Sequence, residues 1–476
     1  MNPDFTTARK IIGVATAAAL LGGCASFSPD GGFDTVQSLA KERTGKDVKW
    51  IRSDADADSV QRLVAELLAS PLSVDDAVQI ALLNNRGLQA TYAELGISEA
   101  DLVQAGRMTN PHLAFLRTRN GDERKLEWAL TFSIIDLLTM PLRQKIEGRR
   151  FEETKLEVAS RTLGVAYETR RAFYAAVAAV ELIRYLEQVK TAAEAGAELA
   201  RRMARAGNFS KLTQMREQVF YAETVTRLAQ SKRTAVAERE RLTRWMGLTG
   251  EETRFRLPER LPDLPGEQPL GSDLEAKAIA GRLDVQAAKR RTENLAESLG
   301  LTKVTRFVNV LELGPARTKE DPEPWKRGYE ISLQLPIFDW GDARVARAEA
   351  IYMQSVHRVA EIATNARSEV REAYSSAATA YDTTRHYRDE IVPLRKQISE
   401  ENMLRYNGML ISVFELLADA REQVASVTAY IGALKDFWLA DTDLQIALNG
   451  AGGAVARGES PRTGGGVIPN PALAGH

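Results

Sequence analysis

Residues 126–136 read Leu-Glu-Trp-Ala-Leu-Thr-Phe-Ser-Ile-Ile-Asp, and residues 329–339 read Tyr-Glu-Ile-Ser-Leu-Gln-Leu-Pro-Ile-Phe-Asp. In both stretches large apolar side chains alternate with polar or small ones, and a period of two puts the apolar set on one face of a β-strand. Transmembrane β-barrels are built from segments of about ten residues with one apolar and one polar face. An amphipathic sheet over a soluble core is the alternative, but the repetition of the stretch favours the barrel.

In the barrel interpretation the polar positions face the lumen and the apolar positions face lipid. The predicted lumen-facing residues are Glu127, Thr131, Ser133, Glu330, Ser332 and Gln334. The predicted lipid-facing residues are Trp128, Leu130, Phe132, Ile331, Leu333 and Leu335. Each stretch needs a partner strand before it, which predicts strand pairs over 111–119 with 126–136 and over 304–314 with 328–338. The connections, 119–125 and the Pro-containing 314–327, are then outward-facing loops.

Other segments recur at a similar offset of about 200 residues, which is too long for a solenoid repeat and indicates a duplicated half-protein. Residues 216–219 (Arg-Glu-Gln-Val) recur as residues 421–424, and Gly207 and Gly408 each interrupt a long helical pattern. Each half is predicted to contain a helix, two strands and a long helical hairpin. We expect the first repeat over 71–248 and the second over 273–449, joined by a Pro-rich linker at 249–272.

The helical hairpins are predicted from apolar residues at 3,4 spacing, which is typical of coiled coils. The pattern runs from residue 142 to 206 without proline and returns between 370 and 398. Pro393 lies inside the second pattern and should kink that helix. Helices of this length need neighbours along their whole extent, so the sequence predicts an assembly of several chains. Residues 450–476 are rich in Gly and Pro and are expected to be disordered.

The N-terminus resembles a secretory signal. Arg9 and Lys10 precede an uncharged apolar run at 11–21, which is too short to span a bilayer. The run ends at Leu21-Gly-Gly-Cys24, which resembles a bacterial lipobox and implies cleavage after residue 23 and acylation of Cys24. Residues 24–70 would then be a lipidated segment. No Asp follows Cys24, so we expect a lipid-anchored protein of a Gram-negative outer membrane; an ordinary signal peptide is the alternative.

Composition excludes several function classes. Lys plus Arg is 63 and Asp plus Glu is 64, and this balance argues against a nucleic-acid partner. One cysteine and four scattered histidines do not form a metal-ligand pattern, and the sequence holds no phosphate loop or serine-nucleophile motif. We therefore expect neither an enzyme nor a cofactor. Four methionines bracket the two hairpin tips, where packing is a more common role than a copper relay: Met203, Met215, Met403 and Met409.

Three further segments carry a family resemblance. Residues 335–341 (Leu-Pro-Ile-Phe-Asp-Trp-Gly) overlap the end of the second stretch, and residues 282–288 (Arg-Leu-Asp-Val-Gln-Ala-Ala) begin a helix. The third segment comprises Tyr406, Asn407 and Gly408, followed by residues 415–417 (Glu-Leu-Leu) and Arg421. Over about residues 70–450, in this order, the chain resembles the TolC-like outer-membrane efflux protein family, in particular its lipoprotein branch.

The resemblance implies a mainly α-helical protein that contributes to a transmembrane β-barrel. Three subunits would each give four strands to one twelve-stranded barrel, and their helices would form a long periplasmic helical barrel. Such a homotrimer docks onto a periplasmic adaptor (membrane fusion) protein driven by an inner-membrane pump, expected here to be of RND type. It would conduct substrates outward without catalysis. A periplasmic coiled-coil lipoprotein without a pore is the alternative, and the transported substrate cannot be read from the sequence.

Four residues at the tips receive roles from the same resemblance. Gly207 and Gly408 are placed where each hairpin reverses, because glycine permits the left-handed conformation that ends a helix. The family's tips contact the adaptor, while a plain turn glycine is the compatible alternative. Glu415 and Asp419 follow the second tip and are the candidate acids of a pore-constricting ring; a solvated helix face is the alternative. The spacing departs from the family pattern, so the choice between them stays open.

Overall fold

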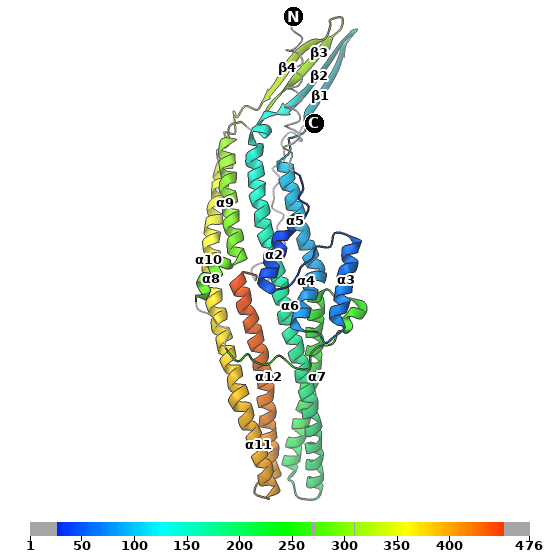
Figure 1. Cartoon of the computed structure of the whole chain (residues 1–476), viewed down its shortest axis with the longest axis vertical. Helices are drawn as coiled ribbons and strands as arrows, with labels where there is room; N and C mark the ends of the chain where they lie inside the picture. Colours follow the sequence, from blue (N-terminus) through cyan, green and yellow to red (C-terminus); the bar gives the residue numbers. More distant parts are fainter. Residues whose placement is uncertain (1–25, 268–272, 309, 452–476) are drawn as a thin grey trace. The chain divides into compact units, whose positions relative to one another are not determined.

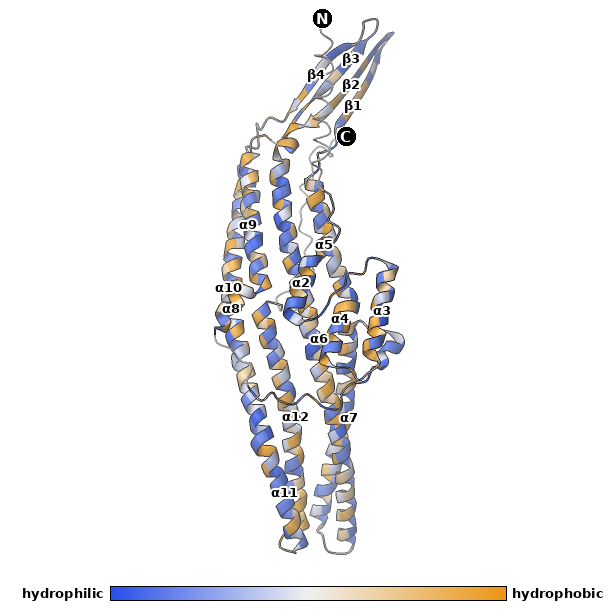
Figure 2. Cartoon of the chain, viewed as in Figure 1, coloured by the Kyte–Doolittle hydropathy of each residue, from blue (hydrophilic) through white to orange (hydrophobic). Residues whose placement is uncertain are grey.

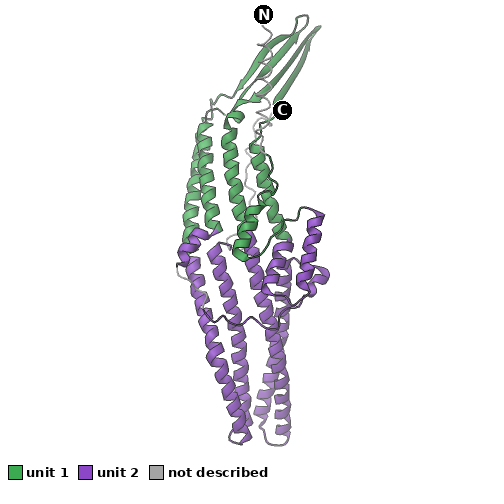
Figure 3. Ribbon diagram, viewed as in Figure 1, with its two compact units in different colours: residues 1–52, 86–159, 283–367 green, residues 53–85, 160–282, 368–476 purple. Residues whose placement is uncertain are grey.

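The computed structural model describes residues 26–267, 273–308 and 310–451. It consists of two compact units (Figure 3). Unit 1 comprises the described residues up to 52 together with 86–159 and 283–367, and unit 2 comprises 53–85, 160–282 and the described residues from 368 onward. The predicted signal peptide, Cys24 and nearly all of the predicted tail lie outside the described residues.

The element order repeats between the two halves of the chain (Figure 1). After α2 (Phe33–Thr44) and α3 (Asp54–Leu68), the first half contains α4 (Val74–Asn84), α5 (Arg86–Ala105), β1 (His112–Asn120), β2 (Glu123–Ser133), α6 (Ile134–Arg205), α7 (Lys211–Met246) and a 3-10 turn (Gly250–Arg254). The second half contains α8 (Leu274–Gly281), α9 (Leu283–Val304), β3 (Leu311–Glu320), β4 (Lys326–Leu333), α10 (Asp342–His386), a π-helical turn (Tyr387–Ile391), α11 (Val392–Asn407) and α12 (Val413–Asn449). The predicted helix–strand–strand–helical hairpin duplication is confirmed.

Unit 1 contains a four-stranded antiparallel sheet in the order β1-β2-β3-β4. Trp128 of β2 lies opposite Phe115 of β1 and Arg317 of β3. Leu313 of β3 lies opposite Phe132 of β2 and Ile331 of β4. The central β2–β3 pair therefore joins the two repeats into one sheet.

The third strand differs from its prediction over 304–314. Helix α9 continues to Val304, and β3 begins only at Leu311. Gly314 and Pro315, interpreted as the start of a loop, lie inside β3, and the connection to β4 is 321–325 instead of 314–327. A Cβ on Gly314 would meet the carbonyl oxygen of Leu130 at 1.7 Å, so glycine permits the close approach of β2. Pro315 has no N–H to donate, and the β2–β3 ladder skips Pro315 and Gly314.

Two strands also end earlier than predicted. Strand β2 ends at Ser133 because helix α6 begins at Ile134, and β4 ends at Leu333. Gln334 donates one more backbone hydrogen bond, to the carbonyl of Val310 at 3.2 Å, but Pro336 cannot continue the ladder. Gln334 and Leu335, predicted as lumen-facing and lipid-facing residues, therefore lie beyond the last residue of β4.

Pro393 coincides with a change of helix type. Helix α10 ends at His386, and residues Tyr387–Ile391 form the π-helical turn that precedes α11. The N–H of Val392 donates to the carbonyl of Tyr387, as a π-helical turn requires. Pro393 removes one backbone donor at this point, which is the physical reason for the predicted disturbance. In the other half Pro141 is tolerated near the start of α6.

Each repeat has a short first helix in unit 2, and residues at the end of that helix donate hydrogen bonds to the carbonyls at the end of the last hairpin helix. Asn84 and Asn85, at the end of α4, donate to carbonyls of Trp245, Met246 and Gly247. Arg282, at the end of α8, donates to the carbonyl of Ala447 at 2.9 Å and pairs with Glu369 at 2.8 Å. The final carbonyls of a helix need such donors, so the same capping device serves both repeats with different residue types.

The Pro-rich linker packs against helices of unit 2. Leu261 and Leu264 are buried, and the N–H of Leu261 donates to Glu181 of α6 at 2.8 Å. The indole N–H of Trp438 donates to the carbonyl of Pro262 at 3.1 Å, and the hydroxyl of Tyr381 donates to that of Gly266 at 3.0 Å. The described part of this linker is therefore an ordered strap along α6, α10 and α12; residues 268–272 lie outside the described ranges.

Candidate functional site

The register of the sheet assigns every strand residue to one of two faces, since residues directly opposite one another share a face. The predicted lumen-facing residues within the strands lie together on one face: Glu127, Thr131, Ser133, Glu330 and Ser332. The predicted lipid-facing residues within the strands lie together on the other: Trp128, Leu130, Phe132, Ile331 and Leu333. Figure 2 shows hydrophobic and hydrophilic residues alternating along these strands.

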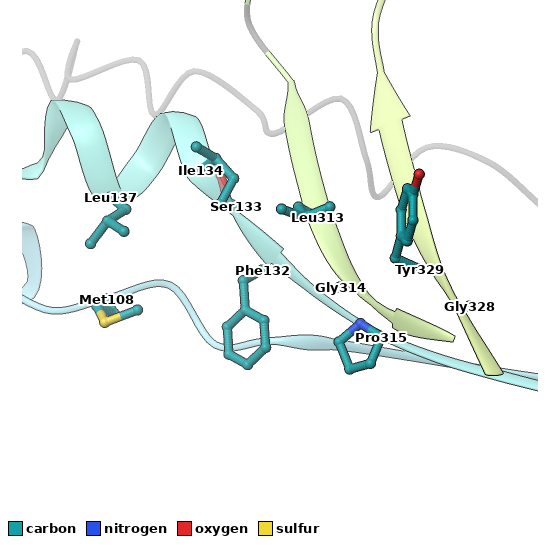
Figure 4. Close-up of a pocket in the computed structure, with 10 residues that line it drawn as sticks. All are labelled: Met108, Phe132, Ser133, Ile134, Leu137, Leu313, Gly314, Pro315, Gly328 and Tyr329. Carbon is teal, nitrogen blue, oxygen red and sulfur yellow. The ribbon is translucent and has the colours of Figure 1, made fainter. Parts of the chain in front are cut away.

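The apolar face is exposed in the subunit. Tyr329 is 76% and Ile331 58% exposed, and Leu113, Phe115 and Leu313 are also exposed. A cavity of about 620 Å³ opens on unit 1 at the helix-proximal end of this face, lined by Met108, Phe132, Ser133, Ile134, Leu137, Leu313, Gly314, Pro315, Gly328 and Tyr329. Figure 4 shows Phe132 and Pro315 on the same side of the strands as Met108 and Leu137. Soluble monomers rarely expose so contiguous an apolar surface, so this face is built for a partner or a membrane.

The polar face combines acids with small side chains. Thr131 donates to Glu312 at 3.0 Å, and Lys125 lies 2.6 Å from Glu127. Glu330 lies opposite Gly314 on β3. Small residues occupy four other central positions of this face (Ala114, Ala129, Ala316 and Gly328), and Leu116 lies opposite Glu127. A face of this composition suits a water-filled lumen.

The two hairpin tips of unit 2 use different residue types in the left-handed conformation that reverses the chain. Gly207 has φ +80°, and the backbone N–H groups of Asn208 and Phe209 cap the carbonyl of Met203, so this glycine takes the expected left-handed conformation. Gly408 has φ −79°, and Met409 takes the left-handed conformation with φ +58°. The expectation of a left-handed Gly408 is therefore wrong, because this turn reverses one residue later.

The two candidate ring acids differ in exposure. Glu415 is exposed in the first turn of α12, where its N–H approaches the N-cap hydroxyl of Ser412 at 3.5 Å. Asp419 is only 8% exposed, and its Oδ2 has no hydrogen-bond partner within the described part of the chain. In the single subunit Glu415 is therefore the acid that can meet solvent.

Sequence reasoning missed an ion pair between the two hairpins. Arg421 of α12 lies 2.5 Å from the buried carboxylate of Glu217 on α7. Both residues belong to the repeated Arg-Glu-Gln-Val segments, which were interpreted as equivalent positions. Arg421 stands further from its N-cap residue Ser412 than Arg216 does from Ser210, so the two segments are out of structural register. Arg421 and Glu217 are nevertheless in contact, and no local sequence signal indicates which residues of the two hairpins face each other.

The tips also expose apolar side chains. Met409 is 92% exposed, and Leu404, Leu410 and Met403 are exposed beside it. The rings of Phe209 and Phe414 lie 4.6 Å apart between centroids and hold the first tip against the second. Among the described residues no group of three or more His, Cys, Asp or Glu side chains could hold a metal ion. None of the described helices is long and apolar enough to cross a bilayer.

Comparison with known proteins identifies the fold. No family model matches the sequence. The cobalt-zinc-cadmium resistance protein CzcC of Cupriavidus metallidurans is 25% identical over 280 residues, which cover 57% of this chain and 64% of that protein. The match thus spans less than two thirds of the relative's length.

Several solved structures superimpose on the chain. A membrane protein from Pseudomonas aeruginosa matches with a TM-score of 0.68 and 17% identity, over 83% of this chain and 93% of that one. The CmeC outer membrane channel of Campylobacter jejuni gives 0.67 and 15%, over 79% and 86%. The open state of the Neisseria gonorrhoeae MtrE outer membrane channel gives 0.66 and 15%, over 79% and 89%.

These likenesses define the class: the chain has the fold of the outer-membrane channels. More narrowly, its fold is that of the TolC-like outer-membrane factors, as the motifs at 282–288 and 335–341 predicted. Membership of the lipoprotein branch stays a prediction, because Cys24 lies outside the described residues.

Proposed function

We propose that this chain is the outer-membrane exit duct of a tripartite efflux system and conducts its substrates passively. The observation that carries the proposal is the two-faced sheet, with an exposed apolar face and a polar face of acids and small residues. Four strands leave two open edges, which lipid does not tolerate, so the barrel must be completed by other copies. Three copies would give the twelve strands expected from the resemblance. No catalytic step is assigned to the chain.

The proposed location is the outer membrane of a Gram-negative bacterium, with the sheet in the bilayer and the helices in the periplasm. Acylation at Cys24 would add a lipid anchor beside the barrel. All four strands connect to helices at the same end of the sheet, so the short turns at the other end face outward. We propose the predicted lumen-facing and lipid-facing sets on this basis.

The hairpin tips are the proposed docking site for the periplasmic adaptor. Exposed Met409, Leu410 and Leu404 form an apolar surface around the second tip, and Gly207 closes the first. Apolar anchors surrounded by polar residues are typical of protein–protein contacts. An inner-membrane pump of RND type would supply the energy. Glu415 is the favoured pore-ring acid because it is exposed, whereas Asp419 would need rearrangement to reach solvent.

Divalent transition-metal ions are the proposed substrate class. The support is the likeness to CzcC, a protein named for cobalt, zinc and cadmium resistance. A deletion strain should become more sensitive to these ions, and expression of the full chain should restore growth. Sensitivity confined to dyes or antibiotics would contradict the metal assignment and leave the duct intact.

Channel recording separates the duct from a scaffold lipoprotein. Purified full-length protein reconstituted into a planar bilayer should give discrete conductance steps. Stable insertion without conductance would favour the coiled-coil scaffold.

A further inference from the structure

The acids of the sheet are confined to one face, whereas most of its bases lie on the other and Lys125 and Lys326 share the face of the acids. The strand acids lie on the polar face: Glu123, Glu127, Glu312, Glu320 and Glu330. The apolar face carries six bases and no acid along β1–β4: Arg117, Arg119, Arg124, Arg317, Lys319 and Arg327. We call these six residues the basic belt.

The belt brings like charges together across the strands. Arg119 lies directly opposite Arg124, and Arg317 lies directly opposite Arg327. Like charges in directly opposite positions destabilise a sheet unless anions lie between them. Within the described residues, Lys319 has Asp321 at 3.3 Å, whereas the exposed Arg117, Arg124 and Arg327 have no carboxylate within ion-pair distance. The arrangement therefore lacks the anions that would stabilise it.

The belt has a fixed place along the strands. Leu311, Leu313 and Leu333 occupy the helix-proximal end of the apolar face, and Trp128 and Tyr329 follow further along. The guanidinium of Arg317 sits over the ring of Trp128 at 5.3 Å from its centroid. The belt begins at the level of Trp128, which lies opposite Arg317, and extends to the turns at 121–122 and 321–325. The order apolar, aromatic, basic matches the hydrocarbon, interface and anionic headgroup layers of a bilayer leaflet.

We propose that the basic belt binds the phosphate groups of lipopolysaccharide, the phosphorylated glycolipid of the outer leaflet. The inference rests on the proposed function, because only an outward-facing position of the turns brings the belt to that leaflet. Five of the six residues are Arg, whose planar fork suits bidentate phosphate contacts. Bound phosphates would also relieve the Arg119–Arg124 and Arg317–Arg327 repulsion and so stabilise the outer rim of the sheet.

Two double variants test the proposal on the full-length protein. Arg124→Gln with Arg327→Gln removes two belt charges, and Lys125→Gln with Lys326→Gln removes the same charge one position away on the polar face. Native mass spectrometry would measure binding of diphosphoryl lipid A, with monophosphoryl lipid A and phosphatidylcholine as comparison lipids. We expect the belt variant to lose about tenfold or more in affinity for the diphosphoryl lipid. The polar-face variant should stay within about twofold of the wild type.

Three outcomes would overturn the inference: equal loss in both variants, no preference of the wild type for the diphosphoryl lipid, or equal competition by inorganic phosphate at the same concentration. Conductance in a phosphatidylcholine bilayer is measured in parallel. Absence of channels there contradicts the duct itself, whereas channels without lipid preference contradict only the belt.

Discussion

Glu153 of α6 provides a pH-sensitive position in unit 1. It is 8% exposed, and burial raises its pKa to about 7 from 4.5, with Glu157 adding to the rise and Arg291 opposing it. The folded state therefore holds a proton that the unfolded chain releases, and ionisation removes stability as the pH rises from 4.5 through 7. Glu153→Gln should stabilise the protein by about 1–3 kcal/mol at pH 8 and by almost nothing at pH 4.5. Thermal unfolding followed by circular dichroism at both pH values checks this, and an equal gain at both would contradict it.

The two tip glycines form a matched pair. Gly207 has φ +80°, where a Cβ is strained, while Gly408 has φ −79° and nothing closer than 3.5 Å to an added Cβ. Gly207→Ala should cost about 1 kcal/mol and Gly408→Ala should be neutral or slightly stabilising. Thermal midpoints of the two variants give the comparison. A larger loss for Gly408→Ala would contradict the assignment of the reversing residue to Met409.

At the scale of single residues, the sequence predicted which face of the sheet a residue occupies better than it predicted backbone conformations. Alternation was enough to assign Trp128 and Glu127 to opposite faces, because side-chain direction follows from strand geometry alone. The left-handed Met409 was missed because a methionine in that conformation carries no local signature. The Glu217–Arg421 pair was missed because its partners are distant in the chain and depend on how the hairpins pack.

Between elements, the Glu217–Arg421 pair joins α7 to α12. Glu217 is buried, so removing Arg421 leaves a desolvated carboxylate, and Arg421→Ala should cost about 2–3 kcal/mol. The Arg395–Glu422 pair between α11 and α12 provides a control, because Arg395 is as half-buried as Arg421 but its partner Glu422 is exposed, and Arg395→Ala should cost less than about 1 kcal/mol. Thermal unfolding and protease sensitivity of the hairpins measure both. Equal effects would show that the first pair contributes no more than a surface contact.

Element boundaries followed the strength of the local signal. Strands β2 and β4 were predicted from clear alternation, and only their ends differ. Strand β3 was displaced in the prediction because Gly314 and Pro315 normally mark turns, whereas here the sheet uses them for a close approach of β2 and a skipped hydrogen bond. The π-helical turn before Pro393 could not be predicted, because it is defined by backbone hydrogen bonds that only the structure gives.

For the whole molecule, the proposed pore ring has a direct electrical consequence. A ring of carboxylates binds divalent cations and narrows the path, so Glu415→Gln should raise single-channel conductance and weaken block by Mg²⁺. The amide keeps the size of the side chain and leaves the helix N-terminus intact. Asp419→Asn should change conductance less, because Asp419 is buried. Unchanged conductance in both variants would contradict an acidic ring at this level.

The number of subunits in the assembly cannot be derived from the residues of the sequence or from the structure of one subunit. The strand count per chain and the open sheet edges require partners, and the value three comes from the resemblance. Chemical cross-linking of the purified protein should therefore stop at a trimer.

The central claim is that the polar face of the sheet lines a water-filled pore while the apolar face meets lipid, and single cysteines on adjacent positions of β4 test it most directly. Cys24 is the only native cysteine, so the wild type serves as the background. Channels carrying Ser332→Cys should lose conductance when a charged, membrane-impermeant thiol reagent is added, and channels carrying Ile331→Cys should not respond. Block of the Ile331→Cys channel alone, or of neither, would contradict the account.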